Sequence, residues 1–382
     1  MPNAPTLRNV LGQPSWRIAS DRVEAFVTQA GGMIGPVTFD RAGRKIQPLS
    51  VAPWHGEKLD PAVPTMLRAL RGDFFCMPFG GNATPYKGET HPPHGEVANH
   101  KWTKPALLRA DDRLTFECSI KTRARPTEVT KNITLRTGHD FVYQAHFIEG
   151  GSGKMAYGHH PMLAFPDRPG SGVVSTSPIA YGRVAPGAFE NPAEGGYQAL
   201  KPGAEFDALE HVPALDGGDA DVSRYPARDG YEDLVMMVAD PSLTLGWTAV
   251  AFPKERYAWF ALKNPAKLPN LVLWLSNGGR HYAPWNGRHR RVMGVEDTLS
   301  YFHLGLAESA KKNPLTEMGY PTAATLNARK PTVIKYGFGV AALPAGFDRV
   351  ARLEPDDRGA SVKLIADSGK TATARVDLDA VL

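Results

Sequence analysis

Apolar and polar residues alternate along much of this chain. The segments Arg113–Lys121, Glu128–Arg136 and Asp140–Glu149 each place apolar side chains at every second position. Side chains two positions apart face the same side of a strand, and turn residues separate these segments at intervals of about ten residues. The pattern predicts antiparallel strands of a β-sandwich. It returns between residues 233 and 302, where the strongly apolar Leu271–Leu275 predicts a strand buried on both faces.

Helical periodicity is weak, and the best helical segment, Leu306–Lys312, predicts one or two turns that end before Asn313-Pro314. Long loops are marked instead by many of the 38 glycines and 33 prolines. A sheet holds such loops rigidly, so we expect them to build the binding site. The main predicted loops are Val51–Pro64, Phe79–Pro93, Pro166–Ser177 and Arg183–Glu194.

The tail of the chain returns to a strand pattern. Val362–Asp367 and Thr371–Leu378 read as two strands, and Ser368-Gly369 between them reads as a hairpin turn. We expect residues 1–330 to form one large β-sandwich domain. Residues 331–382 are interpreted as a C-terminal β appendage or as extra strands of the same sandwich.

Composition narrows the class of protein. A hydrophobic fraction of 42% supports a large core and excludes wholesale disorder. A net charge of +5 is mild for 382 residues and does not indicate a nucleic-acid-binding protein.

Cys76 and Cys118 exclude a disulfide scaffold and a four-cysteine zinc site, and we expect both to be buried free thiols. Met1–Trp16 lacks the apolar core of a secretion signal, and no apolar run approaches ~18 residues, so we expect a cytoplasmic protein without a membrane span.

Candidate chemistry begins with a histidine-rich loop that follows the glycines of Phe79–Asn82. Glycine lets the backbone approach a ligand closely. His94, Glu96 and His100 are possible nitrogen and oxygen ligands of a metal, but two prolines separate His94 from His91 and restrict their approach to one ion. Binding of a sugar or another polar ligand without metal, and ordinary hydrogen bonding within the loop, are the two other interpretations.

Two further motifs carry groups that exchange protons. His159 and His160 are adjacent, so on a strand they face opposite sides and only one of them faces a given site. Glu296 stands in an otherwise apolar strand, where burial of an ionised carboxylate is costly. Desolvation raises the pKa of such a group toward the range of a general base, unless the strand lies at an edge or surface.

Aromatic residues are numerous enough to bind a sugar, because their ring faces suit the C–H face of a pyranose. Core packing is the alternative role, and Trp274 and Trp285 are the two expected exceptions. Gly278–Asn286 is a long loop of polar and aromatic residues, followed by the basic run Arg288–Arg291, which is either a solvated face or a site for a phosphate or carboxylate. The tryptophans considered are Trp54, Trp102, Trp247, Trp259, Trp274 and Trp285.

Together these motifs resemble, in order and spacing, the aldose 1-epimerases (galactose mutarotase-like proteins). Asn82 stands where the family has a loop asparagine, and His94-Gly95 is similar to its His-Gly element before a tryptophan, here Trp102. Gly158–Leu163 is similar to the family's Gly-Trp-His-Pro-Tyr-Phe, and Gly294–Asp297 is similar to its Gly-Ile-Glu-Pro. The resemblance spans roughly residues 20–305.

The resemblance implies a large antiparallel β-sandwich of the supersandwich type and an isomerase that needs no cofactor and no metal. Glu296 would act as the base at O1 of the sugar, and His160 would act as the acid at the ring oxygen O5. His94 would hold the substrate or stabilise charge. These three residues lie more than 200 positions apart end to end, so one site must draw on most of the chain.

This sequence departs from the family pattern in ways that bear on the substrate. The loop asparagine is followed by Ala83 and not by arginine, and Glu296 is followed by Asp297 and not by proline. The missing guanidinium has three possible substitutes, which are Arg68, Arg71 and Lys87. The family's substrate-binding aspartate has no clear match, and the neighbouring candidates are Lys263, Trp274 and Asp73.

The sequence therefore predicts an aldose 1-epimerase-like isomerase with a small sugar as its substrate. A non-catalytic carbohydrate-binding protein on the same fold is the alternative, favoured by the missing Asn-Arg arginine. A cupin-like metalloenzyme is the third interpretation.

Overall fold

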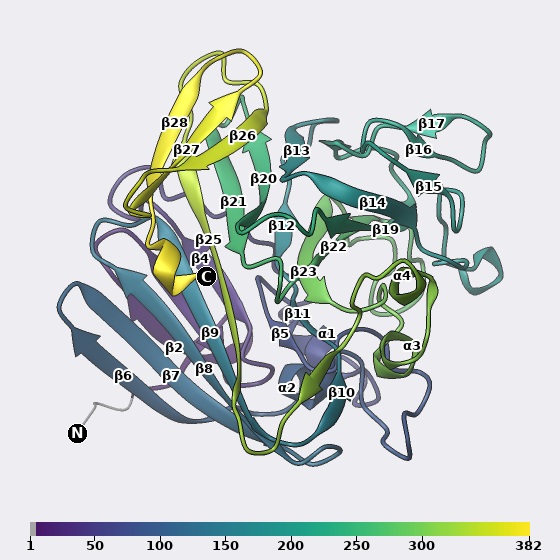
Figure 1. The fold of residues 1–382 in the computed structure, drawn as a ribbon, viewed down its shortest axis with the longest axis horizontal. Helices are drawn as coiled ribbons and strands as arrows, with labels where there is room; N and C mark the ends of the chain where they lie inside the picture. Colours follow the sequence, from purple (N-terminus) through teal and green to yellow (C-terminus); the bar gives the residue numbers. More distant parts are fainter. Residues whose placement is uncertain (1–4) are drawn as a thin grey trace.

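The computed structural model describes residues 5–382 and consists mainly of antiparallel strands. Two large sheets pack face to face, and smaller sheets flank them (Figure 1). The all-β fold class and the large antiparallel sandwich predicted from the alternating pattern are thus confirmed. Cys76 and Cys118 are both buried and unpaired, as expected. No helix within residues 5–382 has the length and apolar character needed to cross a membrane.

The first large sheet contains the predicted meander. Its strand order is β18-β13-β20-β21-β25-β9-β8-β7-β6. In β8 every second side chain is buried along the whole strand, which is the period-two signal seen in the sequence. The strands are β6 Thr103–Ala110, β7 Arg113–Thr122, β8 Thr127–Arg136, β9 Phe141–Gly150, β13 Gly172–Thr176, β18 Arg224–Tyr225, β20 Gly246–Phe252, β21 Tyr257–Lys263 and β25 Thr332–Ala342.

The second large sheet has the strand order β15-β14-β19-β22-β23-β11-β5, and β12 also pairs with β23. All residues of β22 are buried, which confirms the prediction for Leu271–Leu275. The strands are β5 Phe75–Cys76, β11 Tyr157–His159, β12 Met162–Ala164, β14 Ile179–Val184, β15 Glu205–Phe206, β19 Tyr231–Ala239, β22 Asn270–Asn277 and β23 Val292–Leu299.

The main core lies between these two sheets. Ile133 and Trp259 from the first sheet and Leu273 and Val295 from the second are fully buried members of one apolar cluster. Burial of each such side chain contributes about 1.5–3 kcal/mol. Because Val295 faces this core, the next residue along β23 faces away from it, onto the outer face of the second sheet.

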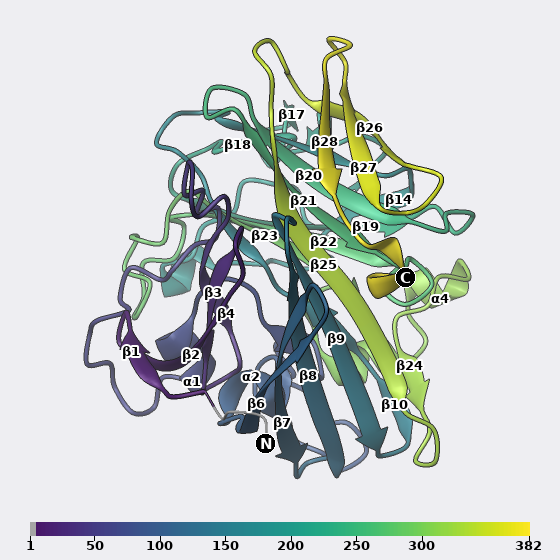
Figure 2. The same ribbon diagram turned by 90° about the vertical axis from the view of Figure 1, so that its left-hand side faces the viewer.

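Smaller elements complete the fold around the two sheets. A four-stranded sheet of the N-terminal strands lies beside β6–β8 (Figure 2). It comprises β1 Arg8–Val10, β2 Gln13–Ala19, β3 Glu24–Thr28 and β4 Ile34–Thr38. The remaining pairs are β10 Gly153–Met155 with β24 Ala324–Leu326, and β16 Val212–Pro213 with β17 Asp219–Ala220. The helices are α1 Thr65–Ala69, α2 Gly95–Asn99, α3 Leu306–Ala310 and α4 Pro314–Glu317, with single 3₁₀ turns at Pro192–Glu194 and Leu378–Ala380.

The predicted helix near residue 306 is present as α3 and ends before Asn313, as expected. Asn313 then starts the short helix α4, which was not predicted. Its side chain accepts a hydrogen bond from the backbone N–H of Thr316, and the Thr316 side chain contacts the Asn313 backbone in return. This capping box, with Pro314 at the first helical position, is a standard helix start.

The C-terminal segment contributes to two sheets. Strand β25 lies inside the first large sheet, between β21 and β9. A separate three-stranded sheet follows, formed by β26 Val350–Pro355, β27 Ser361–Ala366 and β28 Thr371–Arg375. It packs on the outer face of the first large sheet, where Leu364 joins Phe141 and Phe260 in one buried cluster (Figures 1 and 2). The division of the chain near residue 330 stays a prediction.

Candidate active site

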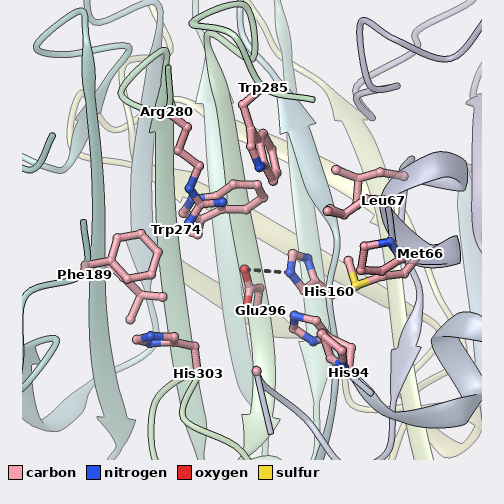
Figure 3. Close-up of a pocket in the computed structure, with 15 residues that line it drawn as sticks. Met66, Leu67, His94, His160, Phe189, Trp274, Arg280, Trp285, Glu296 and His303 are labelled. Atoms are coloured by element: carbon pink, nitrogen blue, oxygen red, sulfur yellow. Dashed lines mark ion pairs between the residues drawn. The ribbon is translucent and has the colours of Figure 1, made fainter. Parts of the chain in front are cut away.

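A cavity of about 190 Å³ opens on the outer face of the second large sheet (Figure 3). Strands β19, β22 and β23 form its floor, and α1 and several loops form its walls. It has room for a small molecule and not only for a single water. The residues that carry the argument below are His94, His160, Phe189, Trp274, Arg280, Trp285, Glu296 and His303, and all of them line this cavity.

Glu296 lies at the centre of the cavity floor, on β23. Its side chain faces outward while its neighbours Val295 and Asp297 face the sandwich interior, as strand alternation requires. Glu296 is only 2% exposed. Gly294 makes room for its carboxyl group, because a Cβ at position 294 would lie 2.3 Å from Glu296 Oε1.

His160 follows β11 and contacts Glu296 directly. Its Nε2 lies 3.3 Å from Glu296 Oε1 (Figure 3). The backbone N–H of His160 donates to Asp73 Oδ1 at 3.0 Å, and its ring stacks on Phe74 with centroids 4.6 Å apart. His159 faces the opposite side, where its Nδ1 lies 3.2 Å from Asp73 Oδ2. The two adjacent histidines therefore face different sides of the sheet, as the alternation predicts.

Burial sets the protonation state of this pair. Loss of solvent raises the pKa of Glu296 well above its usual value, and the positive charge of Arg280 opposes the shift only in part. Burial also lowers the pKa of His160 well below its usual value, and the nearby His94 lowers it further. Both shifts favour the uncharged forms, so a carboxyl group that can donate a proton faces an imidazole that can accept one.

His94 approaches His160 edge-on, with ring centroids 5.0 Å apart. Its Nδ1 lies 3.2 Å from Cys76 Sγ, and burial lowers its pKa to about 3, so the ring is neutral. His94 has a left-handed backbone with φ 57°, and Gly95 follows with φ 77°. A Cβ at Gly95 would lie 1.9 Å from the carbonyl oxygen of Met77, so the backbone at this turn requires glycine at position 95.

Trp274, on β22, lines the cavity and is held by a buried polar network. Its Nε1 donates to Glu232 Oε2 at 2.8 Å, and its ring stacks on His289 with centroids 5.3 Å apart. Ser276 Oγ donates to Glu232 Oε1 at 2.8 Å and lies 2.6 Å from His289 Nδ1. Burial raises the pKa of Glu232 to about 7. The network fixes the orientation of the tryptophan ring against the cavity.

Arg280 was not predicted as a site residue, yet it reaches into the cavity between aromatic rings (Figure 3). Its guanidinium carbon lies 4.7 Å from the centroid of Trp285 and 5.3 Å from that of Trp274. His303, also not predicted, lines the same cavity, and burial lowers its pKa to about 4. The sequence signal available for Arg280 was its place in the polar and aromatic loop Gly278–Asn286.

Four predicted ligand-binding residues lie away from the cavity. The Asn82 side chain donates to the carbonyls of Pro78, Gly80 and Pro92 and accepts from the backbone of Leu306, so it ties loops together. Lys263 pairs with Asp297 between the two large sheets, on the face of β23 opposite Glu296. Asp73 is fully buried in the same interior, and Lys87 is exposed beside Tyr86.

The arginines considered as substitutes for the missing loop arginine are also used elsewhere. Arg71 is buried and donates to the backbone carbonyls of Val10, Leu11 and Ala69. The Arg68 side chain donates to Thr65 within its own helix. Neither arginine lines the cavity, whereas Arg280 does.

The residues considered as metal ligands do not converge. Glu96 Oε2 accepts from the backbone N–H groups of Arg123 and Ala124 at 2.8 and 2.9 Å. At the C-terminal end of α2, His100 Nδ1 lies 3.6 Å from Glu96 Oε1 in a side chain that is 53% exposed, whereas His94 faces the cavity. Within residues 5–382 no group of three or more His, Cys, Asp or Glu side chains has a geometry that could hold a metal ion.

Comparison with known proteins defines the fold. No protein-family model and no curated protein matches the chain. A galactose mutarotase-like protein from Clostridium acetobutylicum superposes with a TM-score of 0.61 at 14% identity, over 88% of this chain and 98% of that one. A candidate mutarotase from Salmonella typhimurium gives 0.58 at 12% identity, over 89% and 94% of the two chains. A candidate aldose 1-epimerase from Escherichia coli K12 gives 0.57 at 13%, over 87% and 100%.

These likenesses place the chain in one structural class, the galactose mutarotase-like β-sandwiches. At such low identities they establish the fold alone, and the chemistry has to be argued from the cavity.

Proposed function

We propose that this protein is an aldose 1-epimerase-like isomerase that interconverts the α and β anomers of a sugar without a cofactor. The observation that carries the proposal is the buried Glu296–His160 pair on the floor of the cavity. A proton donor and a proton acceptor 3.3 Å apart are the groups that this reaction needs.

Anomer exchange requires one proton to leave the hydroxyl at C1 and one to reach the ring oxygen O5. The bond between C1 and O5 then breaks, C1 becomes a carbonyl carbon, and rotation about C1–C2 presents its other face for ring closure. O1 and O5 are both bonded to C1 in the closed ring, so the two proton transfers occur at neighbouring atoms. This spacing suits a pair of side chains in mutual contact.

The proton shared by the pair supports both transfers. Movement of this proton from Glu296 to His160 across their contact gives a carboxylate and an imidazolium. In this form Glu296 removes the proton from O1 while His160 delivers its proton to O5, and ring closure reverses both steps. No proton is gained or lost over the cycle.

The rest of the cavity suits a sugar as the ligand. Trp274 and Trp285 present apolar ring surface to the C–H faces of a pyranose. His94, edge-on to His160, offers a neutral imidazole to a hydroxyl group near the reacting atoms.

The direct test follows freshly dissolved single anomers of a broad aldose panel by NMR or polarimetry with and without the purified protein. We expect equilibration faster than in buffer for at least one sugar of the panel. No acceleration on any member of the panel would reject the isomerase proposal.

Sugar binding without catalysis is the second candidate, and Ala83 in place of the family's loop arginine favours it. Titration of the same sugars by isothermal calorimetry separates the two functions. Tight binding with an unchanged rate of anomer exchange would select the binding protein.

A further inference from the structure

The charge of the cavity depends on one ion pair at its upper wall. Arg280 is the single arginine or lysine among the described residues that line the cavity. Its Nε donates to Glu190 Oε1 at 2.6 Å, and the side chains of the two residues are 15% and 5% exposed. A permanent cation is therefore present beside the proposed sugar site, but a buried carboxylate is bound to it.

The guanidinium uses only part of its hydrogen-bonding capacity in this pair. Within residues 5–382 neither Nη of Arg280 donates a hydrogen bond, and the side chain extends toward the cavity along Trp274 (Figure 3). Phe189, Trp274 and Trp285 have ring centroids between 4.7 and 5.3 Å from its Cζ and restrict its movement. The terminal amino groups are thus held in place with donors to spare for a ligand.

Glu190 is held as firmly as its partner. Tyr282 OH donates to Glu190 Oε2 at 3.2 Å, and the backbone N–H of Glu190 donates to Gln198 Oε1 at 3.1 Å. A Cβ at Gly196 would lie 2.3 Å from Glu190 Oε2, so the glycine leaves the space that this carboxylate occupies. The carboxylate is therefore a fixed counter-ion of Arg280.

The other groups around Arg280 add no positive charge. Glu232 is a second acidic neighbour, with a pKa raised to about 7 by burial. Burial and the charge of Arg280 lower the pKa of His289 to about 3 and that of His303 to about 4, so both are neutral. Burial also favours the uncharged forms of Glu296 and His160. The wall therefore carries no surplus positive charge for an anion.

We propose that the Arg280–Glu190 pair makes this cavity selective for uncharged sugars. Arg280 binds sugar hydroxyl groups through its free Nη donors, and Glu190 cancels the charge that would otherwise attract a carboxylate or a phosphate. A buried anion without a free counter-ion is strongly disfavoured, whereas a hydroxyl group accepts a hydrogen bond from a paired guanidinium without that cost. The inference rests on the proposed function in taking the ligand to be a sugar.

The test compares a neutral aldohexose that binds the wild type with its own uronic acid, which differs only at C6. Dissociation constants are measured by tryptophan fluorescence or calorimetry, so the readout is binding and not turnover. We expect the wild type to bind the aldohexose at least about tenfold more tightly than the acid. In Glu190→Gln, Arg280 keeps its charge but loses the carboxylate bound to it, and we expect the preference for the aldohexose to fall severalfold or to reverse.

Two controls accompany this experiment. Glu57→Gln removes the carboxylate paired with Arg288, a residue that does not line the cavity, and should leave the ratio unchanged. Arg280→Met removes the proposed donors and should weaken binding of the aldohexose. Circular dichroism verifies that each variant is folded.

The ratio of the two dissociation constants in the wild type tests the charge selectivity even if Glu190→Gln does not fold. Tighter binding of the uronic acid by the wild type would overturn the inference, and so would an unchanged ratio in a folded Glu190→Gln. Failure of anomer exchange in the wild type would reject the proposed isomerase but would leave this measurement of charge selectivity valid.

Discussion

Burial has more effect on the acid–base groups in and beside the cavity than any neighbouring charge. Loss of solvent is the largest cause of the raised pKa of Glu296 and Glu232 and of the lowered pKa of His160. All three shifts favour the uncharged form. The proposed mechanism therefore starts from an uncharged Glu296–His160 pair, and its carboxylate–imidazolium form is the less stable of the two.

Glu232 gives a prediction at this scale. The folded-state pKa of Glu232, about 7, lies above its ordinary value of 4.5, so folding favours the protonated side chain. The stability that this preference contributes is complete at low pH and is lost as the pH rises from 4.5 to 7. Glutamine mimics the protonated acid at every pH. Urea unfolding measures the free energy of unfolding of both proteins. Between pH 4 and pH 8 the value for Glu232→Gln should rise relative to that of the wild type by up to roughly 3 kcal/mol. If the two proteins differed in free energy of unfolding by the same amount at pH 4 and at pH 8, the raised pKa of Glu232 would be contradicted.

The sequence identified some of the residues that line the cavity and missed others. Glu296 stood out because a carboxylate interrupted an apolar strand, and alternation separated His160 from His159. Arg280 and Glu190 gave no comparable signal, because their contact joins two irregular loops that lie far apart in the chain. Asn82 and Lys263 have structural roles, in tying loops together and in a buried ion pair. Residue type alone does not distinguish such roles from ligand binding.

At the scale of elements, the strands were the most predictable part of the molecule. Period-two alternation located β7, β8 and β9, and the unbroken apolar run located the doubly buried β22. The helices α1, α2 and α4 were not predicted, because four or five residues establish hardly more than one helical turn and these helices lie among loop residues rich in glycine and proline.

The C-terminal sheet yields a prediction about stability. Leu364 on β27 is fully buried against the outer face of the first large sheet. Leu364→Asp places an unpaired carboxylate there and should lower the free energy of unfolding by about 3 kcal/mol or more. Chemical denaturation measures the loss.

The neighbouring Lys363 is exposed on the same strand and provides the control. Lys363→Asp should cost about 1 kcal/mol or less, because only strand propensity and surface charge change. Equal losses in the two variants would contradict a buried interface between β27 and the large sheet.

At the scale of the whole molecule, the cavity depends on pairing between distant segments. Strand β23 pairs with β22, β11 and β12, and this brings Glu296 beside His160 although 136 positions separate them in the sequence. The motif order indicated that these residues belong to one site. Which further side chains reach it depends on how the loops cross the outer face of the sheet, and no local pattern encodes that.

The most direct test of the account compares anomer exchange by the wild type and by Glu296→Gln on a sugar that both bind. The glutamine keeps the size of the side chain but cannot remove the proton from O1. We predict a fall in kcat of about 10²–10⁴-fold, with sugar binding, followed by tryptophan fluorescence, changed only slightly. A variant that exchanges anomers at the wild-type rate would contradict the central claim.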